Sequence, residues 1–146
     1  MVNRLGCLRG IGTLTGFALA VEITDWHRFT GKTIGAFLGL VPSESSSGQS
    51  RSLGSITKTG NSHARRLLVE AAWHHHRDYS PNARSILHAR WAKTPLEAQL
   101  RGQADNQRLH QQWLAFTARK KRPVIEGVAI ARELAGWCWS LAVMDG

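Results

Sequence analysis

The end of the sequence carries the pattern that most restricts the fold. Apolar residues recur at three- and four-residue intervals from Val124 to Met144, which predicts a long helix with a wide apolar face. Such a face is stable in water only when other elements cover it. We therefore expect this helix to pack the domain together. Its apolar face comprises Val124, Val128, Ile130, Ala131, Leu134, Ala135, Trp137, Cys138, Leu141 and Met144.

The remaining periodic segments also indicate helices. We expect helices at about residues 33–40, 62–77 and 95–117, and helix is favoured after Pro81. Few β-branched residues alternate along the chain, and we find no hairpin turn signal, so we predict an all-α fold. In the helix over 62–77 the residues that share one face are Ala64, Leu68, Ala71, Ala72 and His75.

A glycine turn lies near the start of the chain. Apolar residues surround Gly10-Ile11-Gly12, which predicts a helix-hairpin-helix element with Thr13 as a candidate N-cap of its second helix. Glycines at positions 10 and 12 would let the backbone approach a phosphate, while the next helix offers free N–H groups. An ordinary tight turn without a ligand is the alternative interpretation.

Charge points to a polyanionic partner. The chain of 146 residues holds 19 Lys and Arg against 10 acidic residues, a net charge of +9, and its 42% hydrophobic content suits one compact domain or one with a helical extension. A surface for DNA or RNA follows from that excess, and a solvated basic face without a partner is the alternative. The cluster Arg119-Lys120-Lys121-Arg122 is either a solvated linker or a phosphate contact.

Other classes are disfavoured. Cys7 and Cys138 stand far apart, which indicates reduced core residues and no zinc site. Neighbouring residues of the run His74-His75-His76 point about 100° apart on a helix, so they do not chelate a metal together. The apolar stretches are too interrupted for a secretory signal or a membrane span. We expect a cytoplasmic protein that itself binds no cofactor and no membrane.

The segment from Val41 to Asn61 is rich in Ser and Gly and lacks periodicity, which alone indicates a flexible linker. Its last part, Ile56 to Asn61, leads directly into a helix that bears Arg65 and Arg66. A loop that delivers a hydroxyl and a lysine to a helix N-terminus is suited to hold a phosphodiester. Asn61 as a simple helix cap, beside ordinary surface charge, is the alternative.

Six ordered pieces together resemble the C-terminal domain of transposases of the insertion-sequence 110/116/902 family, with a good match over about residues 3–77 and a loose one beyond. They are Gly10-Ile11-Gly12, Asp25-x-x-Arg28-Phe29, Gly39-Leu40-Val41-Pro42, Ser47-Gly48, Ile56-Thr57-Lys58-x-Gly60-Asn61 and Arg65-x-Leu67-Leu68. The resemblance implies a transposase domain over residues 1–77 and a helical extension over 78–146. It also implies that the Ser/Gly-rich segment is an active loop.

In that family the domain supplies a serine that attacks DNA under the direction of a guide RNA, while four acids of a separate nuclease domain bind Mg²⁺. The resemblance therefore makes Ser47 the candidate nucleophile, with Ser46 as the second choice. No nuclease-like sequence accompanies these motifs, so we expect a truncated copy that is inactive alone and joins oligomers of intact copies at the prokaryotic nucleoid. The residues implied for nucleic-acid binding are Gly10, Gly12, Gly48, Thr57, Lys58, Gly60, Asn61, Arg65 and Arg66.

Two further hypotheses remain open. A non-catalytic remnant would still grip DNA or RNA through the glycine hairpin and the arginine helix. A helical interaction protein without a nucleic-acid role is the third possibility, suggested by the Gln-rich helix over 95–117, and it predicts binding that is indifferent to salt.

Overall fold

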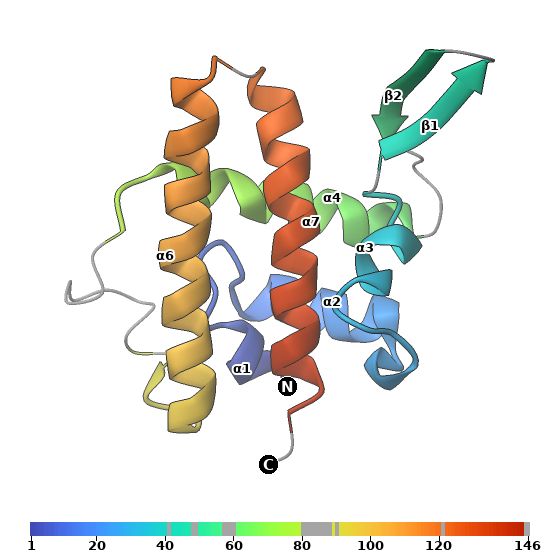
Figure 1. The fold of residues 1–146 in the computed structure, drawn as a ribbon. Helices are drawn as coiled ribbons and strands as arrows, with labels where there is room; N and C mark the ends of the chain where they lie inside the picture. Colours follow the sequence, from blue (N-terminus) through green and yellow to red (C-terminus); the bar gives the residue numbers. More distant parts are fainter. Residues whose placement is uncertain are drawn as a thin grey trace.

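The fold is a helical body with one attached strand pair (Figure 1). The computed structural model describes residues 1–40, 42–47, 50–56, 61–79, 89, 91–120 and 122–144. The predicted all-α class is confirmed for the body. Its elements are α1 (Val2–Leu5), α2 (Thr13–Ile23), η1 (Trp26–Arg28), α3 (Thr33–Phe37), β1 (Pro42–Ser47), β2 (Ser50–Ile56), α4 (Ser62–Ala72), η2 (Trp73–His76), α6 (Leu96–Ala118) and α7 (Pro123–Ala142).

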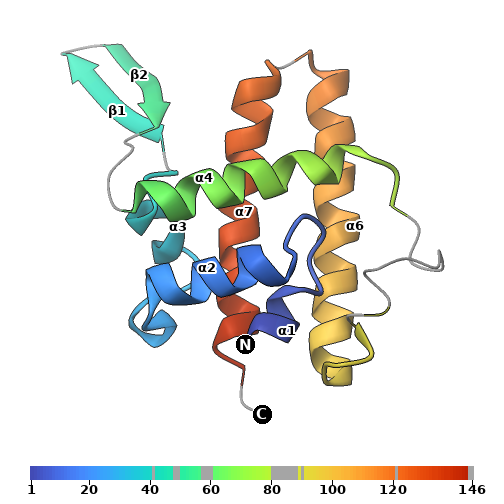
Figure 2. The same cartoon turned by 180° about the vertical axis from the view of Figure 1, so that it is seen from behind.

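Helix α7 is the centre of the body, as its apolar face predicts. It contacts α1, α3, α4 and α6, and α4 crosses behind it in Figure 1 and in front of it in Figure 2. Of the predicted face, the middle and end are buried, whereas Val124 is 71% exposed because the first turn of α7 extends beyond the elements that cover the rest. The fully or nearly fully buried residues of the face are Ile130, Ala131, Leu134, Ala135, Cys138 and Leu141.

The predicted face of α4 is confirmed. Ala64, Leu68, Ala71 and Ala72 are buried, and the same face continues through η2 to His75, which has no exposed surface. The helix itself ends at Ala72, where the last turn tightens into η2. Cys7 and Cys138 are free and buried, as expected.

Close contacts between backbones hold the body together at two glycines. A Cβ placed on Gly102 of α6 would lie 2.6 Å from the Cβ of Cys7, so only glycine allows α6 this near the turn after α1. Gly10, with φ +86°, packs in the same way on α4, where a Cβ would lie 2.5 Å from the carbonyl oxygen of Ala71. These contacts fix the first turn of the chain between α4 and α6.

The first and last helices are joined directly. The guanidinium of Arg4 donates from Nε to the carbonyl oxygen of Leu141 at 2.7 Å and from Nη2 to that of Ala142 at 3.1 Å. These carbonyls belong to the last turn of α7 and have no partner within the helix. Arg4 therefore caps α7 from the other end of the sequence.

The described residues between 42 and 56 form two strands where we expected a loop, so that expectation was wrong. β1 and β2 pair antiparallel, with an irregularity in register between Pro42 and Glu44. A serine-rich sequence gives no alternation of apolar and polar residues, so its period does not reveal a strand.

Candidate nucleic-acid interface

Ser47 lies at the closed end of the strand pair. It is the last residue of β1 and is paired with Ser50, the first residue of β2, while Ser46 is paired with Arg51. Figures 1 and 2 show this end pointing away from the helices. The backbone thus carries the candidate nucleophile out to a position that an extended ligand can approach. Gly48, Thr57, Lys58 and Gly60, predicted to work with it, lie outside the described residues.

Asn61 is confirmed as the N-cap of α4. Its Oδ1 accepts from the backbone N–H of Ala64 at 2.9 Å, and its Nδ2 donates to Oε2 of Glu22 at 2.5 Å. The other carboxylate oxygen of Glu22 lies 3.0 Å from Nδ1 of His63. Hydrogen bonds from His63 and Asn61 lower the pKa of Glu22. The N-terminus of α4 is therefore tied to the last turn of α2.

Glu22 was not predicted for this place, and no local signal could have found it. It precedes Asn61 by 39 positions, and only the packing of α2 against α4 brings the two together. Its carboxylate also places a negative charge at the helix end proposed to meet phosphate. Any anion there has to approach from the side that Glu22 does not cover.

Arg65 and Arg66 have different surroundings. Nη1 of Arg65 donates to the carbonyl oxygen of Leu38 at 3.2 Å, so this partly buried side chain links α4 to the end of α3. The side chain of Arg66 is 70% exposed and lies 3.9 Å from Glu70, one turn along the helix. An exposed pair at this distance is weak. Arg66 is therefore the more available of the two cations for a phosphate.

The glycine turn of residues 10–12 is built into the body. The backbone N–H of Arg9 donates to Oδ1 of Asn106 at 2.9 Å, and Nδ2 of Asn106 donates to the carbonyl oxygen of Cys7 at 3.1 Å. Gly12, and not Thr13, is the N-cap of α2, because Thr13 already has helical backbone. Gly10 has a structural reason for its identity in its contact with Ala71. A phosphate contact by Gly10 and Gly12 stays a prediction.

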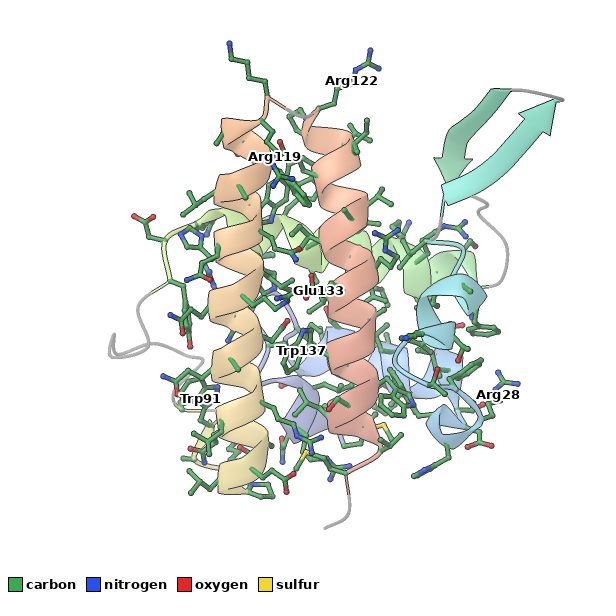
Figure 3. All side chains as sticks on the ribbon, in the orientation of Figure 1. Arg28, Trp91, Arg119, Arg122, Glu133 and Trp137 are labelled. Atoms are coloured by element: carbon green, nitrogen blue, oxygen red, sulfur yellow. The ribbon has the colours of Figure 1, made fainter. Side chains whose placement is uncertain are left out.

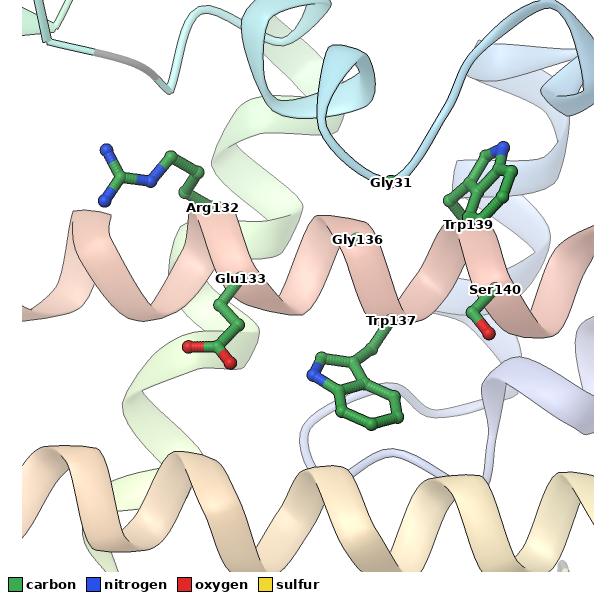
Figure 4. A pocket seen from close by; sticks show the side chains of 7 residues that line it. All are labelled: Gly31, Arg132, Glu133, Gly136, Trp137, Trp139 and Ser140. Carbon is green, nitrogen blue, oxygen red and sulfur yellow. The ribbon is translucent and has the colours of Figure 1, made fainter.

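A separate cavity of about 340 Å³ lies along α7 (Figure 4). Trp139 lies beside Gly31, Arg132 extends from the same side of α7 but away from Gly31, and Glu133 and Trp137 point toward α6. Its one hydroxyl, on Ser140, accepts from Nη1 of Arg101 at 2.8 Å, and Glu133 is paired with Arg108. These polar groups serve the packing of α6 on α7. The cavity contains none of the predicted site residues.

Two further observations limit the chemistry of the described part of the chain. Its His, Cys, Asp and Glu side chains nowhere gather in a group of three or more that could hold a metal ion. None of its helices combines the length and the apolar character that crossing a membrane requires.

Comparison with known proteins places these features in a family. A sequence model described as the transposase IS116/IS110/IS902 family matches residues 2–88. A putative transposase, y4qE, of Sinorhizobium fredii is 34% identical over 143 residues, which are 97% of this chain and 36% of that protein. No solved structure matches the chain.

Two other relatives are similar over about half of the chain. A probable family 20 transposase of Pseudomonas aeruginosa is 39% identical over 72 residues, 49% of this chain and 21% of that protein. A transposase for insertion sequence element IS1328 of Yersinia enterocolitica is 40% identical over 71 residues, 48% of this chain and 21% of that protein. The chain thus spans about a third of the y4qE protein, and the aligned parts are about a fifth of the other two. Because the family match covers more than half of the sequence, the protein belongs to the IS116/IS110/IS902 family of transposases.

Proposed function

We propose that this chain is the serine-bearing domain of a DNA transposase, which binds DNA and a guide RNA and supplies Ser47 for strand cleavage and exchange. The observation that carries the proposal is the position of Ser47 at the closed end of a strand pair that stands off the body, in a member of a transposase family. The net charge of +9 supports a phosphate-rich ligand.

In the proposed step, Oγ of Ser47 attacks a backbone phosphorus. A serine–phosphate bond forms as the bond to one deoxyribose oxygen breaks, and the Ser47 proton leaves to a base. A serine hydroxyl needs such activation, and the charge on the phosphate needs neutralising cations. The proposal assigns Mg²⁺ to acids of a separate nuclease domain, because the described residues contain no suitable group of ligands.

The binding part of the proposal uses the base of the strand pair. Arg66 offers an exposed cation on α4, and Arg65 and Asn61 hold that helix against α3 and α2. Thr57, Lys58 and Gly60 would add phosphate contacts in the segment that leads into α4, and Gly48 would leave backbone room beside Ser47. The protein would act at chromosomal DNA in a prokaryotic cytoplasm, together with intact transposase copies.

The test is a covalent DNA adduct formed when the chain is combined with the nuclease part and guide RNA of a full-length relative. Ser47→Ala should abolish the adduct and leave DNA affinity nearly unchanged, because one hydroxyl contributes little to a many-contact interface. Ser46→Ala is the matched control and should retain the adduct. Mass spectrometry that maps the adduct to another residue would refute the role of Ser47. Salt-sensitive binding without any adduct would support a non-catalytic nucleic-acid-binding protein instead.

A further inference from the structure

The turn between α6 and α7 carries a group of exposed cations. Arg119, Lys120 and Arg122 are all exposed, and within the described residues none of them makes an ion pair. The nearest acid along the chain, Glu126, is only 4% exposed and so does not cover them. Figure 3 shows Arg119 and Arg122 at the end of the helix pair. We call Arg119, Lys120 and Arg122 the basic turn.

Two cations of the basic turn occupy positions where local stability favours other residues. Lys120 has φ +55° just after the end of α6, a position where glycine is the usual residue because a side chain there strains the backbone. Arg122 is the N-cap of α7, where Ser, Thr, Asp or Asn would satisfy free N–H groups and where the helix dipole disfavours a cation. The charge of Arg122 is therefore not explained by the stability of the turn, whereas Arg119 and Lys120 follow the C-terminus of α6, where the helix dipole favours cations.

The basic turn and the strand pair project from the same end of the molecule. Both lie at the upper end in Figures 1 and 2, while the two chain termini lie at the lower end. Helix α4 runs from the base of the strand pair to α7, which begins at the basic turn. Its first turn is capped by Asn61 beside the strand pair, and the ring of Trp73, just after its end, lies against Gly127 in the second turn of α7, where a Cβ would be 3.5 Å away.

This connection fixes the spacing of the two features. The 11 residues of α4, which separate Asn61 from Trp73, span about 17 Å at the usual rise of a helix. At 3.4 Å per base pair, that length corresponds to about five base pairs of duplex DNA. One short duplex can thus lie across both features, and their shared direction leaves the rest of the body on one side of it.

We infer that the basic turn is a second DNA-binding site, which holds the phosphate backbone of the same duplex that the strand pair approaches, about five base pairs from the base of the pair. The inference rests on the proposed function. The ligand is duplex DNA, because the strand pair and the basic turn project from the same end of the molecule. The exposed Val124 and Ile125 beside the turn make an anionic membrane the rival to exclude.

The test uses Lys120→Gly combined with Arg122→Ser. Both substitutions improve the local geometry, so the thermal midpoint should rise while DNA binding weakens. Loss of two phosphate contacts should reduce the slope of log affinity against log salt concentration by about 1.8. Between 50 and 200 mM NaCl, the affinity for a 20-base-pair duplex should therefore fall about 12-fold more for the unmodified protein than for the variant. The control is Arg28→Gln with Lys93→Gln, which removes two exposed cations elsewhere. Figure 3 shows Arg28, and Trp91 two residues before Lys93, in the lower half of the view, away from Arg119 and Arg122.

Each outcome decides the question. Equal salt slopes for the variant and the unmodified protein overturn the inference and leave the proposed function standing. Absence of DNA binding by the unmodified protein overturns both. A variant that loses affinity for duplex RNA or for anionic phosphatidylserine vesicles, but keeps its affinity for DNA, assigns the turn to that ligand and overturns the inference.

A direct contact can be recorded with a photocrosslinker on Lys120→Cys. Cys7 and Cys138 are completely buried and burial raises the pKa of both thiols, so neither competes for the reagent. Crosslinks to the duplex from position 120, and not from Lys93→Cys, support the inference. Crosslinks of equal yield from both positions contradict it.

Discussion

The side chain of Asn61 joins two helices by donating from Nδ2 to Oε2 of Glu22 at 2.5 Å while its Oδ1 caps α4. The end of α2 is therefore joined to the start of α4 by both ends of one amide, beside the contact of His63 with Glu22. The two halves of this amide perform separable tasks, since one satisfies the helix end and the other reaches a carboxylate on a different helix.

Substitution of Asn61 should separate these tasks. Asn61→Ser keeps a capping oxygen and loses the bond to Glu22, so we expect a loss of about 1 kcal/mol in the free energy of unfolding. Asn61→Ala loses both and should cost about 2 kcal/mol. Urea unfolding measures the difference. In a double-mutant cycle, Glu22→Gln should couple to Asn61→Ala and not to the distant control Gln103→Ala; additive effects at Glu22 and Asn61 would contradict the link.

His75 should make the protein sensitive to acid. It has no exposed surface, and burial and the nearby charge of Arg9 lower its pKa to about 3. The unfolded chain binds a proton near pH 6.5 and the folded one does not, so stability falls as the pH drops from about 6.5 toward 3, by up to about 1.4 kcal/mol per pH unit. His75→Leu should flatten this part of the curve in urea titrations at pH 7, 6 and 5. The exposed control His27→Gln should leave it unchanged.

Asp105 should act in the opposite direction. It is completely buried, neither carboxylate oxygen has a hydrogen-bond partner among the residues that the structure describes, and burial, with the charge of Glu133, raises its pKa well above the usual aspartate range. The folded protein then holds a proton that the unfolded chain releases, so this residue lowers stability as the pH rises above about 4. Asp105→Asn should increase the free energy of unfolding at pH 7 by about 2 kcal/mol. No gain at pH 7, or the same gain at pH 4, would contradict a raised pKa of Asp105 in the folded protein.

Two glycines in helices should respond to alanine with opposite signs. At Gly102 the new methyl group would lie 2.6 Å from the Cβ of Cys7, and we expect a loss of about 1–3 kcal/mol. At Gly127 it would meet the Trp73 ring at an ordinary 3.5 Å, and the better helix propensity of alanine should stabilise the protein by up to about 1 kcal/mol. Thermal unfolding of the two variants compares them directly. A tolerated Gly102→Ala would mean that α6 can move away from the turn after α1.

The helices were predictable because their evidence is local. The apolar faces of α4 and α7 follow from the spacing of residues such as Leu68 and Leu134, both of which are buried. Periodicity does not say how far the covering elements extend, and so it wrongly included Val124. It also left open that Leu14, Phe17 and Val21 on α2 would be more than half exposed.

The site was only partly predictable. The capping role of Asn61 depends on the three residues that follow it, whereas its bond to Glu22 depends on the packing of two helices. The strand pair that carries Ser47 could not be inferred from periodicity because its strands contain mainly small polar residues. Gly10 is the opposite case. In the sequence this glycine suggested a backbone that approaches a ligand, whereas in the structure it is needed because the backbone packs closely against Ala71 of α4.

The contact of Arg4 with the carbonyls of Leu141 and Ala142 makes the two ends of the chain one cooperative unit. If α1 detaches, the last turn of α7 loses its cap and its amides become free to exchange with solvent at the same opening free energy as those of α1. Local fraying of either terminus is thereby suppressed, although terminal segments are ordinarily the first to open. In hydrogen exchange, the beginning and the end of the sequence should behave as neighbours.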